Sequence, residues 1–264
     1  MRTGLDMTGD GRNDSADDTQ GYGEFRGAKA LAVLSRLPIA QAQARDFSGF
    51  LWRDLPHALL PEISSEALEI QRLSSTGHWD VPVLISPQQR LHLLIYQVGP
   101  PIFGRHENRN LFRNHDETAF WTWFLDGNLP MPPPEGAFVL IGGSNLDPED
   151  GDGMHQAMRS LLAHPALQDP RPTSEGARLA STDPRNAAHR GPPELDTVHW
   201  PQIPGPGNLR VSYILPARDL QVMGSGVFWP VPNNPEAYLL GDQDAPPTRH
   251  RLVWVDVMID EPNP

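Results

Sequence analysis

The stretch that decides the fold prediction is Trp79-Asp-Val-Pro-Val-Leu-Ile-Ser86, followed after Pro87-Gln-Gln89 by Arg90-Leu-His-Leu-Leu-Ile-Tyr-Gln-Val98. Apolar residues recur at every second position in both runs, and the residues between the runs favour a turn. This is the pattern of a β-hairpin. The opposite faces of the runs are also mostly apolar, as Leu94 and Tyr96 show. We therefore expect the hairpin to be covered on both sides and to lie in the core.

The composition favours many short elements over long helices. The chain has 264 residues, of which 29 are Pro and 23 are Gly. Such a content predicts short strands joined by turns and extended loops. The expected fold class is α+β and β-rich, with an antiparallel sheet or sandwich core, short N-terminal helices and a long Pro-rich loop.

We expect two regions along the chain. Residues 1–23 are an acidic N-terminal segment with almost nothing to bury, so they should be disordered without a ligand. Residues 24–264 should form a single β-rich globular domain with an irregular Pro-rich excursion at about 165–207. Long loops of this kind tend to be binding arms or lids.

Hydrophobic spacing places the other elements. Helical spacing predicts helices over residues 25–37, 64–73, 117–125 and 154–163, with Asp116 and Asp152 as caps of the last two. Alternation predicts strands over residues 137–141, 209–215, 227–229, 237–240 and 252–259.

Charge and composition limit the partners. The formal net charge of −12 argues against nucleic acid, because phosphate binding relies on a basic surface. Other protein subunits are the expected partners, because a chain uses long Pro-rich segments and an acidic terminus to wrap its neighbours. The sequence leaves the oligomeric state open. No apolar run is long enough to span a membrane, and no signal peptide is visible. These observations favour a cytoplasmic protein or part of a phage or secreted assembly.

The N-terminal segment contains a calcium-loop pattern. In a twelve-residue calcium loop, the oxygen ligands come from positions 1, 3, 5, 7, 9 and 12, and position 6 is glycine. Those ligand positions are occupied here by Asp6, Thr8, Asp10, the carbonyl of Arg12, Asp14 and Asp17, and Gly11 takes the glycine position. The segment resembles the EF-hand-like loops of dockerins and of thrombospondin type 3 repeats. It departs from a full EF-hand because Thr8 is neutral, Asp17 replaces Glu and no helix precedes the loop. The resemblance implies a structural Ca²⁺ ion.

A second candidate site lies in the polar loop at 106–117. Two histidines, His106 and His115, stand beside the carboxylates of Glu107 and Asp116. These groups could hold a divalent metal, or an imidazole could act as a base that a carboxylate orients. Their spacing matches no helical metal-binding pair, so a polar surface loop explains them equally well.

The preferred function is non-catalytic, since no set of nucleophile, base and oxyanion donors is recognisable. The sequence favours a structural or interaction subunit of a larger bacterial or phage assembly, with a calcium-ordered N-terminal segment. One alternative is a metal-dependent hydrolase that uses His106, Glu107, His115 and Asp116. Another is an acidic binding module for a basic partner protein, such as an immunity factor.

Overall fold

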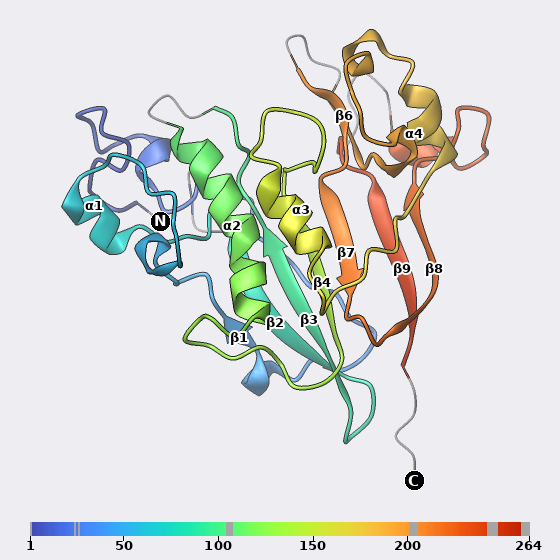
Figure 1. Cartoon of the computed structure of the whole chain (residues 1–264), viewed down its shortest axis with the longest axis horizontal. Helices are drawn as coiled ribbons and strands as arrows, with labels where there is room; N and C mark the ends of the chain where they lie inside the picture. The colour runs from blue at the N-terminus through green and yellow to red at the C-terminus, as the bar shows by residue number, and fades with distance from the viewer. Residues whose placement is uncertain are drawn as a thin grey trace.

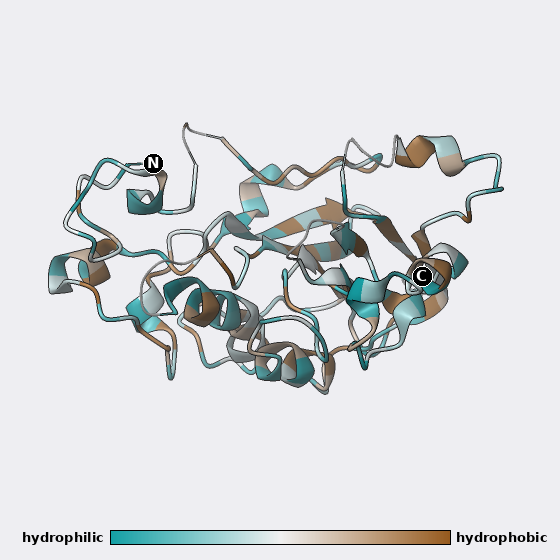
Figure 2. Ribbon diagram, turned by 90° about the horizontal axis from the view of Figure 1, so that it is seen from above, coloured by the Kyte–Doolittle hydropathy of each residue, from teal (hydrophilic) through white to brown (hydrophobic). Residues whose placement is uncertain are grey.

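The protein is built on a central β-sheet with helices against it. The computed structural model describes residues 2–23, 25, 27–103, 108–200, 205–241 and 248–259. A five-stranded sheet has the order β1-β2-β3-β4-β7, and helices α2 and α3 lie in front of it (Figure 1). Two smaller sheets, β5–β6 and β8–β9, complete the β structure of these residues. Seen from above, apolar strands occupy the interior, and helices cover one side of them (Figure 2).

The elements have the following bounds. The strands are β1 (Arg45–Asp46), β2 (Gly77–Leu84), β3 (Arg90–Gln97), β4 (Phe138–Gly143), β5 (Val198–Trp200), β6 (Gly207–Leu209), β7 (Ser212–Pro216), β8 (Gln221–Phe228) and β9 (Leu252–Met258). The α-helices are α1 (Ser65–Ile70), α2 (Arg109–Leu125), α3 (Gln156–Leu162) and α4 (Glu175–Ala180). The short 3₁₀ turns are η1 (Ala16–Asp18), η2 (Gln41–Gln43), η3 (Trp52–Asp54), η4 (Pro184–Asn186), η5 (Pro193–Leu195) and η6 (Ala237–Leu240). No helix in the described ranges combines the length and apolar character that crossing a membrane requires.

The predicted hairpin is confirmed as β2 and β3. The two strands pair antiparallel, with Trp79 opposite Ile95. Beyond them, β3 pairs with β4 in parallel, with Ile95 opposite Ile141, and β4 pairs antiparallel with β7. The α+β class is therefore confirmed, and the β3–β4 pair makes the sheet mixed. A parallel pair requires a crossover, which α2 provides.

The main core lies between α2 and the sheet. Phe120, Trp121 and Phe124 of α2 are each at most 1% exposed, and they belong to one buried cluster with Leu94 and Leu140. The aromatic run was predicted as a helix beginning at residue 117, whereas α2 begins at Arg109. Because a helix presents residues spaced by three and four on one face, these aromatic rings meet the sheet together.

Asp116 does not cap a helix. It lies inside α2, and its carboxylate accepts a hydrogen bond from Trp52 Nε1 at 2.6 Å. Similarly, α3 begins after His155, so Asp152 is not its cap. Neither helix has a side-chain cap: α2 begins after Asn108, whose φ is +61°, and α3 begins after His155.

The helix predicted over residues 25–37 is wrong. The described residues of this stretch form turns and coil. Gly27 and Lys29 have φ angles of +88° and +58°, which interrupt any right-handed helix. Leu34 is 97% exposed, so this apolar position has no core to contact. An amphipathic pattern without an apolar partner surface does not stabilise a helix by itself.

The Pro-rich segment is not an extended arm. It contains α4, η4, η5 and β5, and its residues Leu167 and Val198 are fully buried. Ser174 caps α4 by accepting a hydrogen bond from the Ala177 amide at 3.1 Å. The strand predicted over 237–240 is also wrong, because these residues form η6. Prolines here set short turns that pack back onto the domain.

The acidic N-terminal segment contacts the rest of the chain. Met7 is fully buried, and the Gln20 side-chain amide donates to the carbonyl of Ile70 at 2.8 Å. The segment is therefore packed against the rest of the chain, and the prediction that residues 1–23 are disordered is wrong for the described residues 2–23.

Truncating the core beside α2 should destabilise the protein. Leu140 on β4 is fully buried. We expect Leu140→Ala to lower the free energy of unfolding by roughly 2–5 kcal/mol, because the cavity left behind loses its packing contacts. Urea unfolding measures the change. Leu34→Ala is the matched control and should change the free energy by less than about 0.5 kcal/mol. Equal effects of the two substitutions would contradict the assignment of the core.

Candidate functional site

A cavity of about 560 Å³ lies where the N-terminal segment meets α2 and the end of β3. Its walls include Lys29, Ser75, Gly99, Arg109, Arg113 and Glu117. Gly99 follows β3, and three of these residues belong to the first half of α2. Ligand sites of α/β proteins commonly lie beyond the carboxyl ends of strands, and this cavity has that position beside β3.

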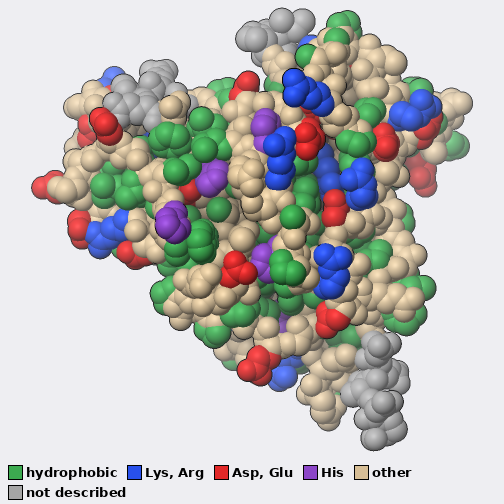
Figure 3. All heavy atoms as spheres, viewed as in Figure 1, with side chains coloured by type: hydrophobic (Ala, Val, Ile, Leu, Met, Phe, Trp, Pro, Cys, Tyr) green, Lys and Arg blue, Asp and Glu red, His purple; other side chains and the backbone are tan. Residues whose placement is uncertain are grey.

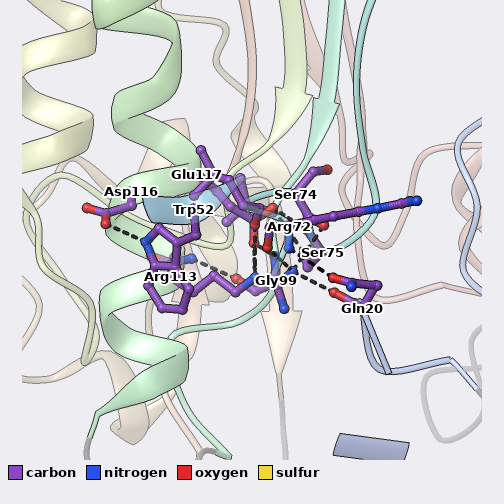
Figure 4. A network of polar contacts seen from close by, with 12 residues as sticks. Gln20, Trp52, Arg72, Ser74, Ser75, Gly99, Arg113, Asp116 and Glu117 are labelled. Carbon is purple, nitrogen blue, oxygen red and sulfur yellow. Dashed lines mark hydrogen bonds and ion pairs between the residues drawn. The ribbon is translucent and has the colours of Figure 1, made fainter. Parts of the chain in front are cut away.

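Arg113 is the centre of the wall. Its guanidinium donates hydrogen bonds to the carbonyls of Leu73 at 2.8 Å and of Ser74 at 3.0 Å. It also donates to the carbonyl of Gln20 at 2.6 Å, so it binds the N-terminal segment to α2. Figure 4 shows these contacts converging on the side chain. A buried guanidinium is tolerated because its donors are satisfied by backbone carbonyls.

Glu117 lies one helical turn further along and is fully buried. Its carboxylate accepts hydrogen bonds from the Ser75 amide at 2.9 Å and the Ser75 hydroxyl at 3.1 Å. The Arg113 Nε lies 3.8 Å from its Oε1. Burial raises the pKa of Glu117 to about 7, although Arg113 and the hydrogen bonds act in the opposite direction. A carboxyl that titrates near neutral pH in a cavity is suited to proton transfer.

Arg109 and Lys29 make one side of the cavity cationic. Burial and the neighbouring Arg113 lower the pKa of Arg109 to about 10, so it stays charged at neutral pH. Its Nη2 donates to Gln71 Oε1, while its buried Nε has no partner among the described residues. The ammonium of Lys29 lies 4.7 Å from the ring centre of Tyr22. The carboxylates of Asp17, Asp18 and Glu117 act on the charge of Arg109 as well, and Asp17 also lines the cavity. The unsatisfied Arg109 Nε and the Lys29 ammonium are the donors that an anionic ligand could use.

Asparagines fix the strand ends beside the cavity. Asn114 Nδ2 donates to the carbonyls of Gly99 and Ser144, both at 2.8 Å, which joins α2 to the ends of β3 and β4. Asn145 Nδ2 donates to the carbonyl of Val98 at 2.8 Å. The side chain of Asn145, in the turn after β4, is therefore occupied in a contact with the chain itself.

Charged side chains elsewhere compensate one another. On the face in Figure 3, arginine and carboxylate side chains gather together over α3 and the region of β6. Arg210 pairs with Asp169 at 2.6 Å, and Arg159 pairs with Glu149 at 3.1 Å. Each of these guanidinium groups is thus offset by a carboxylate in direct contact.

The histidine loop is only partly described. His106 and Glu107 lie outside the described residues. His115 Nδ1 is 2.8 Å from Asp116 Oδ1, and the other oxygen of Asp116 binds Trp52 and the Leu59 amide. Asp116 is therefore committed to joining α2 to the segment before α1. The use of this loop as a metal site stays a prediction.

The predicted calcium ligands are engaged in hydrogen bonds and ion pairs within their own segment. Asp6 accepts hydrogen bonds from the amides of Thr8, Gly9, Asp10 and Gly11, which lower the pKa of its carboxyl against the effect of burial. Asp10 accepts from the Arg12 amide, and Asp14 lies 3.6 Å from the Arg12 guanidinium. Within the described parts of the chain, no group of three or more His, Asp or Glu residues could hold a metal ion. The sharp glycine turn is thus stabilised by backbone donors, and Asp17 lies in η1.

The residues of the cavity were missed by the sequence reasoning. Arg109, Arg113 and Glu117 follow one another at intervals of four residues and so share one face of α2. Charged residues at this spacing, directly before an aromatic run on the same helix, were the available signal. The prediction began the helix at residue 117 and left both arginines in a loop.

Comparisons with known proteins show which family the sequence matches and which solved structures resemble the fold. The sequence model of the endonuclease/exonuclease/phosphatase family matches residues 3–250. Solved structures with similar folds include an endonuclease/exonuclease/phosphatase from Beutenbergia cavernae, at 15% identity and a TM-score of 0.47, over 84% of this chain and 46% of that one. A family protein from Leptotrichia buccalis has 14% identity and a TM-score of 0.43, over 85% of this chain and 64% of that one. Sphingomyelinase C from Streptomyces griseocarneus has 14% identity and a TM-score of 0.36, over 84% and 62%. No curated protein matches.

The chain spans about half to two thirds of the length of these solved structures. The family match over residues 3–250 contradicts the identification with dockerin-like or thrombospondin-like calcium loops, which rested on twelve residues. It also contradicts the expected non-catalytic structural subunit, because the family is one of hydrolytic enzymes. The expected protein partners stay a prediction.

Calcium should not stabilise the Asp6 loop. We expect the melting temperature of the parent to be unchanged by millimolar Ca²⁺, because the Asp6 oxygens already accept backbone hydrogen bonds. Asp6→Ala should lower the free energy of unfolding by about 1 kcal/mol, with or without Ca²⁺. Thermal unfolding with and without chelator measures both effects. Stabilisation of the parent by Ca²⁺ that Asp10→Ala abolishes would contradict this account.

Glu117 should make stability pH-dependent. Its folded pKa of about 7 exceeds its ordinary value of 4.5, so the folded state binds more protons than the unfolded state between these values. The free energy of unfolding should therefore fall as pH rises through this window, by up to roughly 3 kcal/mol. Glu117→Gln should lack this fall, whereas the exposed control Glu62→Gln should keep it. Urea unfolding at about pH 5 and about pH 8 tests this, and equal pH dependence in all three proteins would contradict it.

Proposed function

This chain belongs to the endonuclease/exonuclease/phosphatase family, and we propose that it hydrolyses a phosphoester in the cavity that Arg109 and Glu117 line. The observation that carries the proposal is the family match over residues 3–250. The cavity supports it because a cationic side and a carboxyl with a pKa of about 7 occupy the same walls. Of the functions that the sequence left open, hydrolysis is the one that agrees with the family.

The cationic side would bind the phosphate. Arg109 and Lys29 supply donors and positive charge, and phosphate oxygens are good partners for both. Arg113 is a positioning residue, since its donors are taken by the carbonyls of Gln20, Leu73 and Ser74. It fixes the N-terminal segment against α2 and so sets the shape of the site.

Glu117 would move the proton. Hydrolysis joins the oxygen of water to phosphorus, breaks the bond from phosphorus to the alcohol oxygen and transfers a proton to that alcohol. A carboxyl with a pKa of about 7 can accept or donate this proton at neutral pH. The hydrogen bonds from Ser75 hold the carboxylate in one orientation.

Enzymes of this family commonly use divalent metal ions. The question is whether the side chains of the cavity could bind such an ion. Divalent ions of this kind prefer several carboxylate or imidazole ligands. The described residues contain no group of three or more such side chains placed to hold an ion. Glu117 is bound by Ser75 and lies beside Arg113, which leaves it a poor ligand. The residues that the structure describes do not fit a resident metal, and the proposal includes no step through one.

The substrate class would be a small phosphoester. With a net charge of −12, the chain would repel the phosphate backbone of a nucleic acid. A single phosphate group in a cavity of about 560 Å³ requires only local positive charge, which Arg109 and Lys29 supply.

Hydrolysis of p-nitrophenyl phosphate and bis-p-nitrophenyl phosphate between about pH 5 and pH 9 tests the proposal. We expect Glu117→Gln to lower kcat by roughly 10² or more, because it removes the proton-transfer group. Arg109→Gln should raise KM about tenfold or more, because it removes a charged donor to the phosphate.

Arg12→Gln, an exposed arginine outside the cavity, is the control and should leave both constants unchanged. Thermal unfolding of each variant separates loss of activity from loss of folding. A folded Glu117→Gln variant as active as the parent would overturn the assignment of the site. Failure of the parent to hydrolyse either ester, with and without added Mg²⁺ or Mn²⁺, would overturn the proposed reaction.

A further inference from the structure

A second cavity, of about 480 Å³, lies between α4, η6 and the beginning of β9. Its walls include Leu179, Trp229 and Leu240 on the apolar side and His199, Arg249 and Arg251 on the polar side. It shares no lining residue with the cavity around Glu117. Volumes of this size accommodate small organic molecules.

The floor of this cavity is a separate small core. Ala177, Val227 and Trp229 form a buried cluster against which Leu240 packs. α4 lies close to it, since a Cβ added at Gly176 would be 2.0 Å from the Trp229 carbonyl oxygen. The close approach of α4 and β8 gives the cavity a packed apolar wall, which suits a flat or aliphatic group.

Arg251 brings a positive charge that no carboxylate in the described parts of the chain offsets. Its guanidinium carbon lies 4.6 Å from the ring centre of Trp229, and its Nη1 donates to the Thr248 carbonyl at 3.4 Å. Its Nε is buried without a hydrogen-bond partner. Burial lowers the pKa of Arg251, and the like charge of Arg249 lowers it further. A guanidinium with a buried, unsatisfied nitrogen favours the arrival of an anion.

His199 provides a second polar contact at the same wall. Its Nδ1 is 2.7 Å from the side-chain oxygen of Asn208, which can only accept, so Nδ1 carries the proton. Asn208 is fully buried, and its own amide donates to Asn186 Oδ1 at 2.8 Å. The imidazole is thereby held in place, and its Nε2 is left as a hydrogen-bond acceptor that can receive a polar hydrogen of a ligand.

Among the described residues, the carboxylate that lines this cavity is Asp183, and it is already paired. Asp183 accepts hydrogen bonds from the Arg185 amide at 3.0 Å and from Arg185 Nε at 2.8 Å. These contacts with Arg185 lower the pKa of Asp183, so it stays ionised within its own pair. Asp183 also interacts electrostatically with His199, whereas no carboxylate of the described residues acts in this way on Arg251.

We propose that this cavity binds an amphiphilic organic anion, with its apolar or aromatic body against Trp229 and Leu179 and its oxyanion at Arg251. Carboxylate, sulfonate and phosphate groups share the required chemistry, because each offers several oxygen acceptors and a negative charge to a guanidinium. The site is independent of the proposed hydrolysis, since neither Arg109 nor Glu117 contributes to it.

Isothermal titration with naphthalene-1-sulfonate tests the site on the full chain. This probe carries an aromatic body and an anion and contains no phosphoester bond. We expect the parent to bind it, and Arg251→Gln to weaken the binding about tenfold or more, as for the loss of one charged hydrogen bond in a partly buried site. The uncharged 1-naphthalenemethanol should bind more weakly to the parent, with an affinity that Arg251→Gln leaves unchanged.

Arg218→Gln, a substitution of an exposed arginine, is the matched control and should bind naphthalene-1-sulfonate like the parent. Leu179→Asp should abolish binding of both naphthalene compounds, and thermal unfolding establishes that each variant is folded. Arg109→Gln should keep full binding, which separates this site from the proposed hydrolytic one. Equal binding of the probe by the parent and a folded Arg251→Gln variant, or no binding by the parent, would overturn the proposal.

Discussion

The structure depends on the buried guanidinium of Arg113. It lies inside α2 and donates to backbone carbonyls on both sides of the bend that leads into β2, and to the N-terminal segment. The guanidinium needs these acceptors because it is out of water. If either the guanidinium or the carbonyls were displaced, the remaining groups would be buried without hydrogen-bond partners, which is costly for a buried charge. The contact thus couples three segments that are far apart in sequence.

Glu117 extends this coupling to the sheet. It accepts from Ser75, just before β2, and lies near the Gly99 amide, just after β3. Asn114 continues the line to Ser144 at the end of β4. One face of α2 therefore holds the ends of the central strands, while its aromatic face packs on their sides. The same polar contacts that fix the helix also form the wall of the cavity, so fold and site share one set of interactions.

The arginines in the two cavities have different surroundings. Around Arg113, donors are satisfied by backbone, and the charge is accompanied by Glu117. Around Arg251, the guanidinium lies over Trp229 and has one long hydrogen bond. The first arrangement stabilises the fold, whereas the second leaves capacity for a ligand. Burial alone does not distinguish the two arginines, because both side chains are largely removed from water. They differ in the number of hydrogen-bond acceptors around each guanidinium.

Sequence patterns predicted elements wherever apolar alternation and burial coincide. The β2–β3 hairpin, β4, β7 and β9 were predicted because their alternation has a core on at least one side. The residues 25–37 carry a helical pattern and yet form coil, since left-handed Gly27 and Lys29 and an exposed Leu34 outweigh local propensity. The family match rests on a pattern spread over residues 3–250, whereas the calcium loop rested on twelve residues in a segment already rich in Asp and Gly.

The sequence by itself therefore determined the α+β class, the central hairpin and the cysteine-free acidic character of the chain, because each follows from local periodicity or from composition. Only the tertiary structure decided which charges are buried together. The fold brings Arg113 and Glu117 together with the carbonyls of residues 72–74. It also brings Arg113 to the carbonyl of Gln20, which is ninety-three residues away in the sequence. The pKa of Glu117 is set by the burial and the neighbours that this assembly creates. No local pattern specifies such neighbours, since burial is a property of the packed whole.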